Sequence, residues 1–192
     1  MRWPPRFAFT GGTLAIDFAQ TGGEGYRARW EGWHRPEDLT DWAELQPDLR
    51  IRPSASDAEL AEARVLREAI WRIARAHVED TPRPDADFAY LETIAATPDL
   101  APVWRAGRRQ WQENASFSRV LSSVARDALS LFGTERLERF RECANPNCQL
   151  MFIDNSRPGR RQWCSMGRCG NLSKVARHRA KTKGENHDHH EH

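Results

Sequence analysis

Four cysteines lie close together near the carboxyl-terminal end of this 192-residue chain. They are Cys143, Cys148, Cys164 and Cys169, and they form two C-x4-C pairs separated by 15 residues. Where thiols stay reduced, paired cysteines bind a metal more often than they form disulfides. Zinc takes four ligands in a tetrahedron, and two short loops that each supply two thiolates satisfy that requirement. The spacing therefore predicts one structural Zn²⁺ held by these four side chains.

Two other uses of the four thiols remain open, an iron–sulfur cluster and disulfide bonds. Iron–sulfur motifs usually have tighter or more irregular spacing, so the pattern favours zinc. A metal with four protein ligands has no open coordination position, and we expect it to be structural rather than catalytic. The sequence also shows no nucleotide-binding loop and no Ser-His-Asp order. We therefore expect that the protein is not an enzyme.

The segment around the second cysteine pair is strongly basic. The overall net charge of +2 conceals an asymmetry, because residues 1–154 carry 20 Arg, no Lys and 24 acids. Residues 155–183 carry six Arg and three Lys with no acid. Such an excess is the electrostatic signature of a surface that binds a polyanion. Arg160, Arg161 and Arg168 lie nearest the ligands and could offset the negative charge of a four-thiolate zinc site.

A basic helix is predicted to follow the second cysteine pair, over about residues 167–181. On its helical wheel Cys169, Leu172 and Val175 face the zinc site, whereas the solvent side is basic. Contact with DNA phosphates is the favoured use of the basic residues, and an inert solvated surface is the alternative. The residues that we expect to contact nucleic acid are Arg157, Arg160, Arg161, Lys174, Arg177, His178, Arg179 and Lys181.

The segment between the cysteine pairs is predicted to form a hairpin. Residues 150–153 are an apolar strand, residues 155–159 are rich in turn-forming types, and residues 160–163 return as a second strand. With the cysteine loops and the basic helix, this gives the order of knuckle, hairpin and helix. A small treble-clef-like zinc finger is therefore expected.

The preceding part of the chain is predicted to be mostly helical. Ser56 and Glu59 form a capping box at the start of a helix over residues 57–79. The alternation around Gly-Gly in residues 7–21 indicates a short hairpin or strand. Trp30, Trp33 and His34 resemble a ligand pocket, but aromatic filling of a small helical core is favoured. Further helices are predicted over residues 35–45, 86–96 and 115–132, and two short strands over residues 100–112.

The predicted fold class is mainly α, with a multihelical amino-terminal domain that carries small β-hairpins, followed by the zinc finger. We place the helical domain at residues 1–140, the finger with its basic helix at 141–184, and a disordered His-rich tail at 185–192. The chain has no apolar run of the roughly 18 residues that a membrane span needs. Its start, MRWPPRF, lacks the apolar region of a secretion signal. We therefore expect a cytoplasmic protein without membrane contact.

The cysteine segment resembles the zinc finger of bacterial ABATE-domain proteins that end in a CGNR finger. Residues 11–21, GGTLAIDFAQT, also resemble the opening of the ABATE domain, with Gln20 where the family has Asn. The resemblance implies a zinc-binding, stress-linked transcription regulator whose amino-terminal domain has no established chemistry. The finger motif matches at Cys143, Cys148, Phe152, Asp154, Ser156, Arg157, Arg160, Arg161, Trp163, Cys164, Ser165, Met166, Cys169, Gly170 and Asn171.

The chain departs from the family motif at Leu172, where the signature Arg should stand. If this position packs inside the finger, Leu replaces the aliphatic stem of that Arg. If the family Arg touches a phosphate, this protein should bind DNA more weakly than its relatives. We favour a DNA-binding regulator, with a purely structural zinc module for protein packing as the alternative. The sequence leaves open a homo-oligomer and the identity of any small-molecule effector.

Overall fold

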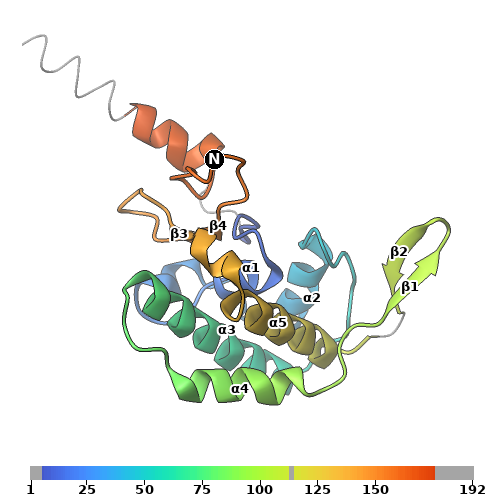
Figure 1. Cartoon of the computed structure of the whole chain (residues 1–192). Coiled ribbons are helices and arrows are strands. Elements are labelled where there is room, and N and C mark those ends of the chain that lie inside the picture. The colour runs from blue at the N-terminus through green and yellow to red at the C-terminus, as the bar shows by residue number, and fades with distance from the viewer. Residues whose placement is uncertain (1–5, 113–114, 176–192) are drawn as a thin grey trace, which may run out of the picture.

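The computed structural model of the chain describes residues 6–112 and 115–175. The fold is mainly α with two small antiparallel hairpins, so the predicted fold class is confirmed (Figure 1). Its helices are α1 (Leu14–Ala19), α2 (Pro36–Leu45), α3 (Asp57–Val78), α4 (Asp85–Ala95) and α5 (Phe117–Phe132), with short 3-10 segments η1 (Gly25–Trp30) and η2 (Glu135–Arg139). Its strands are β1 (Pro102–Arg105), β2 (Arg108–Trp111), β3 (Phe140–Glu142) and β4 (Met151–Ile153).

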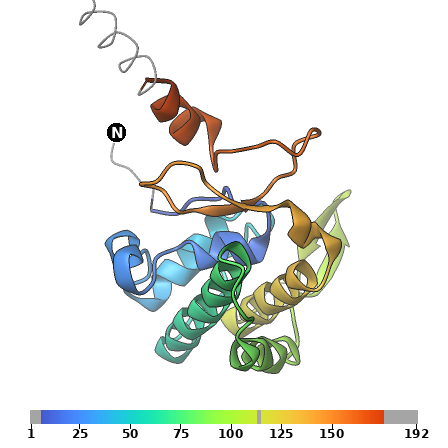
Figure 2. The same ribbon diagram turned by 60° about the vertical axis from the view of Figure 1, so that its left-hand side comes forward.

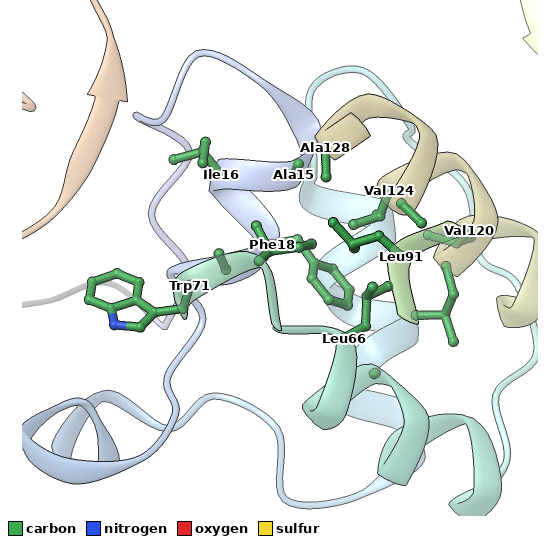
Figure 3. Close-up of a cluster of buried hydrophobic side chains, with 14 of the residues drawn as sticks. Ala15, Ile16, Phe18, Leu66, Trp71, Leu91, Val120, Val124 and Ala128 are labelled. Atoms are coloured by element: carbon green, nitrogen blue, oxygen red, sulfur yellow. The ribbon is translucent and has the colours of Figure 1, made fainter. Parts of the chain in front are cut away.

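The main core lies between α1, α3, α4 and α5, and Figure 3 shows their apolar side chains meeting. Helix α3 starts as predicted, because the Ser56 hydroxyl accepts from the Glu59 N–H and the Glu59 carboxylate accepts from the Ser56 N–H. Its apolar face, which includes Leu66, is buried. No helix in the described parts of the chain has the length and apolar character needed to cross a bilayer.

Trp33 fills this core, as the preferred interpretation of the aromatic cluster predicts. Its ring centroid lies 4.7 Å from that of Phe18 and 6.3 Å from that of Trp42, and all three side chains are fully buried. Trp30 lies outside the core on η1, where it packs edge-on against Tyr26. Of the three residues of the predicted cluster, only Trp33 packs in the core against α1 and α2, and His34 is exposed.

The prediction of a strand or hairpin over residues 7–21 is wrong, because Leu14–Ala19 form α1. The Thr13 hydroxyl accepts from the N–H of Ile16 and starts the helix after the Gly-Gly. Residues 15–19 are all buried. A short helix that is buried on every side has no apolar periodicity, and the sequence pattern therefore did not predict a helix here.

The two strands predicted within residues 100–112 are confirmed as β1 and β2. Trp104 pairs with Arg109 and Arg105 pairs with Arg108 in antiparallel register. Ala106 and Gly107 form the two-residue turn, with φ of 50° and 75°. This left-handed turn matches the twist of a hairpin, and it keeps the two strands closely paired to their tip.

The finger's hairpin differs from the predicted one. Strand β4 forms as expected, but it pairs with β3, so that Phe140 lies opposite Ile153 and Glu142 opposite Met151. Residues 160–163 instead run beside the first cysteine loop, where the Ala144 N–H donates to the Gln162 carbonyl over 2.9 Å. The predicted pairing of residues 150–153 with 160–163 is therefore wrong.

Candidate metal centre

The four cysteines converge on one point, as their spacing predicts. Their sulfur atoms lie within 4.8 Å of one another and all four side chains are buried. The Sγ atoms of Cys148 and Cys164 are 3.5 Å apart, and those of Cys164 and Cys169 are 3.7 Å apart. Thiolates at the usual zinc–sulfur distance of about 2.3 Å form a tetrahedron with edges of about 3.8 Å. The arrangement fits one Zn²⁺ and is too wide for a disulfide, whose sulfurs are about 2.05 Å apart.

A tight backbone loop presents the first cysteine pair. The N–H of Cys143 donates to the carbonyl of Leu150, and the N–H of Cys148 donates to the carbonyl of Asn145, both over 2.9 Å. Gln149 takes a left-handed conformation, with φ of 56°, as the chain leaves the loop. The Asn145 side-chain amide also lies 3.5 Å from the sulfur of Cys169, which joins the first loop to the second.

The second pair sits at the start of the carboxyl-terminal helix. Cys164 precedes a wide π-type turn, η3 (Met166–Gly170), that contains Cys169, and helical residues continue to 175. Gly170 is buried there, and a Cβ atom would come within 3.0 Å of the Met166 sulfur and 3.4 Å of the Trp163 ring. A larger residue would displace these neighbours, so close packing accounts for the glycine of the motif.

The four thiols lie close enough together to shift one another's pKa. Hydrogen bonds from Cys148 and Cys164 lower the pKa of Cys143 to about 2. The same contact with Cys143 raises the pKa of Cys148 to about 12, and it also raises the pKa of Cys164. Protons and negative charge are therefore unevenly shared in the metal-free cluster. A bound divalent ion removes this conflict, because it stabilises all four thiolates together.

Asp154 turns the chain after β4 and explains the failed hairpin prediction. Its carboxylate is buried and accepts from the backbone N–H groups of Ser156, over 2.9 Å, and Arg161, over 2.8 Å. Hydrogen bonds from Ser156 and Arg161 hold the pKa of Asp154 below its usual range. The loop therefore closes on this carboxylate, which leaves no ladder of hydrogen bonds between residues 160–163 and β4.

Arg161, one of the residues that we predict to contact nucleic acid, is half-buried and bonded within the finger. Its guanidinium donates to the carbonyl of Trp163 over 2.9 Å and to that of Cys164, and lies 4.3 Å from the Phe152 ring centroid. These bonds hold its positive charge beside the metal ligands. That position matches the expectation that basic residues near the cysteines offset the thiolate charge.

The other predicted contacts fall into two groups. Arg157, Arg160 and Lys174 are exposed on the finger. Arg177, His178, Arg179 and Lys181 lie outside the described residues, as does the tail at 185–192.

The helical wheel was wrong for the apolar residues of the finger helix. Leu172 is 57% exposed and Val175 is 46% exposed, although both were expected to cover the zinc site. The π-type turn at Met166–Gly170 is the physical reason, because each such turn contains an extra residue and shifts the phase of everything after it. A wheel drawn with a regular repeat from Cys169 therefore points these side chains to the wrong side.

Strand β4 connects the finger to the helical body, which the sequence did not reveal. Met151 and Ile153 face the main core, whereas Leu150 and Phe152 pack with the cysteines. The Met151 N–H donates to the side-chain carbonyl oxygen of Gln20 over 3.0 Å. The only signal for this contact was the position of Gln20 in the GGTLAIDFAQT motif, whose partner lies 131 residues away.

Two family models match the chain. One, ABATE, is described as "Putative stress-induced transcription regulator" and matches residues 12–135. The other, described as CGNR zinc finger, matches residues 139–182 and includes all four cysteines. No curated protein sequence matches. The suspected resemblance and the structural zinc site are both confirmed, and the chain belongs to the ABATE family and carries a CGNR zinc finger at its carboxyl-terminal side.

Proposed function

We propose that the protein is a non-catalytic transcription regulator of the cytoplasm that contacts DNA through its zinc finger. The observation that carries this proposal is the exposed basic face of the finger. Arg157, Arg160 and Lys174 are exposed, and residues 155–183 contain no acid that could neutralise them. The description of the ABATE family as transcription regulators supports the same conclusion.

The arginines of the finger differ in their surroundings, and this difference supports DNA contact. Arg161 already supplies one positive charge beside Cys164, so most of the exposed cations are not needed to balance the net charge of a zinc ion held by four thiolates. An exposed guanidinium is well suited to a phosphate, which it can bind through two parallel hydrogen bonds. The Asp154 carboxylate, which accepts from the N–H groups of Ser156 and Arg161, holds the loop that carries Arg157 and Arg160 in one conformation, and this reduces the entropic cost of such contacts.

A structural zinc module without DNA is the second candidate, and one observation favours it. The finger is joined to the body by β4 and by an ion pair between Arg75 and Glu142, with 3.0 Å between nitrogen and oxygen. The zinc could therefore serve only to complete the fold. This anchoring uses none of the exposed cations, however, so it leaves the basic face of the finger without a role.

A titration of labelled duplex DNA over a series of salt concentrations tests the proposal. We expect affinity to fall linearly with log salt, and Arg160→Gln with Lys174→Gln to reduce the slope by about 0.9 for each phosphate that the variant no longer neutralises. Arg83→Gln, an exposed arginine before α4, is the matched control and should keep the wild-type slope. Chelation of zinc should abolish binding. Absence of binding by the zinc-loaded protein at low salt would refute DNA contact and leave the structural alternative.

A further inference from the structure

The β1–β2 hairpin projects from the helical body and pairs only with itself among the described strands (Figure 1). Its base is fixed to the body. The ring N–H of Trp111 and the guanidinium of Arg109 both donate to the Asp48 carbonyl over 3.3 Å. The Gln112 N–H donates to the Ala101 carbonyl over 2.9 Å, which extends the pairing of the hairpin's own two strands. The hairpin is therefore an arm that is hydrogen-bonded to the helical body, and its outer half is exposed to solvent.

The composition of that outer half works against the hairpin's own stability. Arg105 and Arg108 are direct cross-strand partners on either side of the turn, so two positive side chains lie together at the tip. Ala106 takes a positive φ in the turn, which costs a residue with a Cβ about 1 kcal/mol or more. Two-stranded hairpins are also only marginally stable in isolation. Such a concentration of unfavourable local features is expected where a surface is shaped for a partner.

The arm exposes an aromatic ring together with its positive charge. Trp104 is 75% exposed, and it is the one exposed tryptophan among the residues that the structure describes. Arg105, Arg108 and Arg109 are exposed as well, and residues 100–112 contain no acid. The helical body is otherwise acidic, so this hairpin is a local basic surface on a domain of opposite sign.

We propose that the β1–β2 hairpin is a second DNA-contacting element. In this arrangement Arg105 and Arg108 bind backbone phosphates of duplex DNA and the Trp104 ring packs against the sugar–phosphate backbone. The inference rests on the proposed function of the finger. Its physical basis is charge complementarity at the tip, together with the width of a two-stranded ribbon, which the major groove of duplex DNA admits.

The position of the arm is compatible with a shared duplex. In both views its tip points toward the side of the molecule that carries the finger, whereas α4 lies on the opposite side (Figure 1, Figure 2). A duplex that meets the finger can therefore extend toward the hairpin. Two contacts on separate elements would also fix the orientation of the protein along the DNA, which a single basic helix does not do.

The test uses the full-length, zinc-loaded protein and a labelled duplex of random sequence, titrated over a series of KCl concentrations. The double variant Arg105→Gln/Arg108→Gln should reduce the slope of log affinity against log salt by about 0.9 for each phosphate that it no longer neutralises. Trp104→Ala should weaken binding several-fold at every salt concentration and leave the slope unchanged. Arg83→Gln is again the control, and circular dichroism melting establishes that each variant is folded.

The outcomes separate this inference from the proposed function. If wild-type protein binds and Lys174→Gln reduces the slope while the hairpin double variant does not, the hairpin inference is wrong and the finger proposal stands. If wild-type protein does not bind at low salt, the finger proposal itself fails. Altered sedimentation of the hairpin variants with an unchanged DNA slope would overturn the inference in favour of an interface with a second copy of the chain.

Discussion

The backbone N–H of Ile153 donates to the carbonyl oxygen of Gly11 over 2.8 Å. This bond joins the finger's strand β4 to the Gly-Gly segment that precedes α1. The N–H of Gly11 in turn donates to the buried carboxylate of Asp17 over 2.7 Å. The opening motif of the ABATE domain therefore contacts strand β4 of the zinc finger directly, and the two family regions pack together.

Loss of zinc should destabilise the whole chain as well as the finger. Cys148→Ser removes a ligand, and we expect the variant to release zinc and lose several kcal/mol of stability, because metal binding energy is folding energy. Met151 and Ile153 belong to the main core, so the thermal transition of the helical body should also fall. Metal analysis and calorimetry measure both effects. The neighbouring Asn147→Ser is the control, and an unchanged main transition in Cys148→Ser would contradict the coupling.

Substitution of Gly12 should weaken the contact between the finger and the body. Its φ is +82°, and a Cβ atom would lie 3.2 Å from the Asn155 amide nitrogen and 3.4 Å from the Ile153 Cβ. Gly12→Ala should reduce the free energy of unfolding by about 1 kcal/mol for the left-handed backbone and by about 1 kcal/mol more for crowding.

Gly25→Ala separates these two contributions in the same urea titration. Gly25 also has a positive φ, +62°, but a Cβ atom there meets nothing within 4 Å. Its substitution should therefore show only the backbone effect. Equal losses in the two variants would indicate that the Gly12 contact with the finger adds nothing to stability.

The adjacent residues Arg160 and Arg161 should have opposite phenotypes. Arg161→Gln removes the charged donor to the Trp163 and Cys164 carbonyls, so we expect about 2–3 kcal/mol lower stability and faster zinc loss to a chelator. Arg160→Gln affects an exposed side chain and should change stability by less than about 0.5 kcal/mol while it reduces the salt slope of DNA binding. A stable, zinc-retaining Arg161→Gln protein would argue against the internal role.

Leu172→Arg should increase DNA affinity. The side chain is 57% exposed, which removes the possibility that Leu172 stands in for an aliphatic stem packed inside the finger. Restoring the CGNR arginine adds an exposed cation to residues 155–183, a segment without acids, so the salt slope should steepen by about 0.9. Leu172→Gln controls for loss of the apolar surface. An affinity no greater than that of Leu172→Gln would show that this position does not face the DNA.

Asp17 should make the fold less stable as pH rises. Burial raises the pKa of Asp17 from 3.8 to about 7. The negative charges of Asp48 and Asp127 also raise this pKa, whereas the hydrogen bond from the Gly11 N–H lowers it. Between these values the folded chain keeps the proton while the unfolded chain releases it. The contribution of Asp17 to the free energy of unfolding is therefore greatest below pH 3.8. It decreases between pH 3.8 and about pH 7 and is constant at higher pH.

The variant Asp17→Asn tests this dependence by urea unfolding across that range. Its stability relative to wild type should increase with pH by up to roughly 4 kcal/mol, because the amide has no charge to bury. The comparison with wild type cancels acid effects on the zinc site, and Asp80→Asn serves as an exposed control. A difference that does not vary with pH would show that the carboxyl of Asp17 is not buried in its protonated form.

Local patterns predicted most of the helices because their causes are local. The capping box at Ser56, the apolar stripe of α3 and the Ala106-Gly107 turn each depend on residues within a few positions of one another. The cysteine site could be predicted equally well, since metal chemistry restricts both the ligand type and the spacing of each pair. These features needed no knowledge of the rest of the fold.

Three features could not be predicted from the hydrophobic pattern of the sequence. The partner of β4 depends on Asp154, which closes its own loop. Helix α1 is buried and therefore has no apolar periodicity. The exposure of Leu172 follows from one π-type turn. Sequence patterns alone identified the metal ligands and the positions of most helices. The fold determined which basic residues face outward and how the finger meets the body, because those contacts join residues more than a hundred positions apart, such as Gly11 and Ile153.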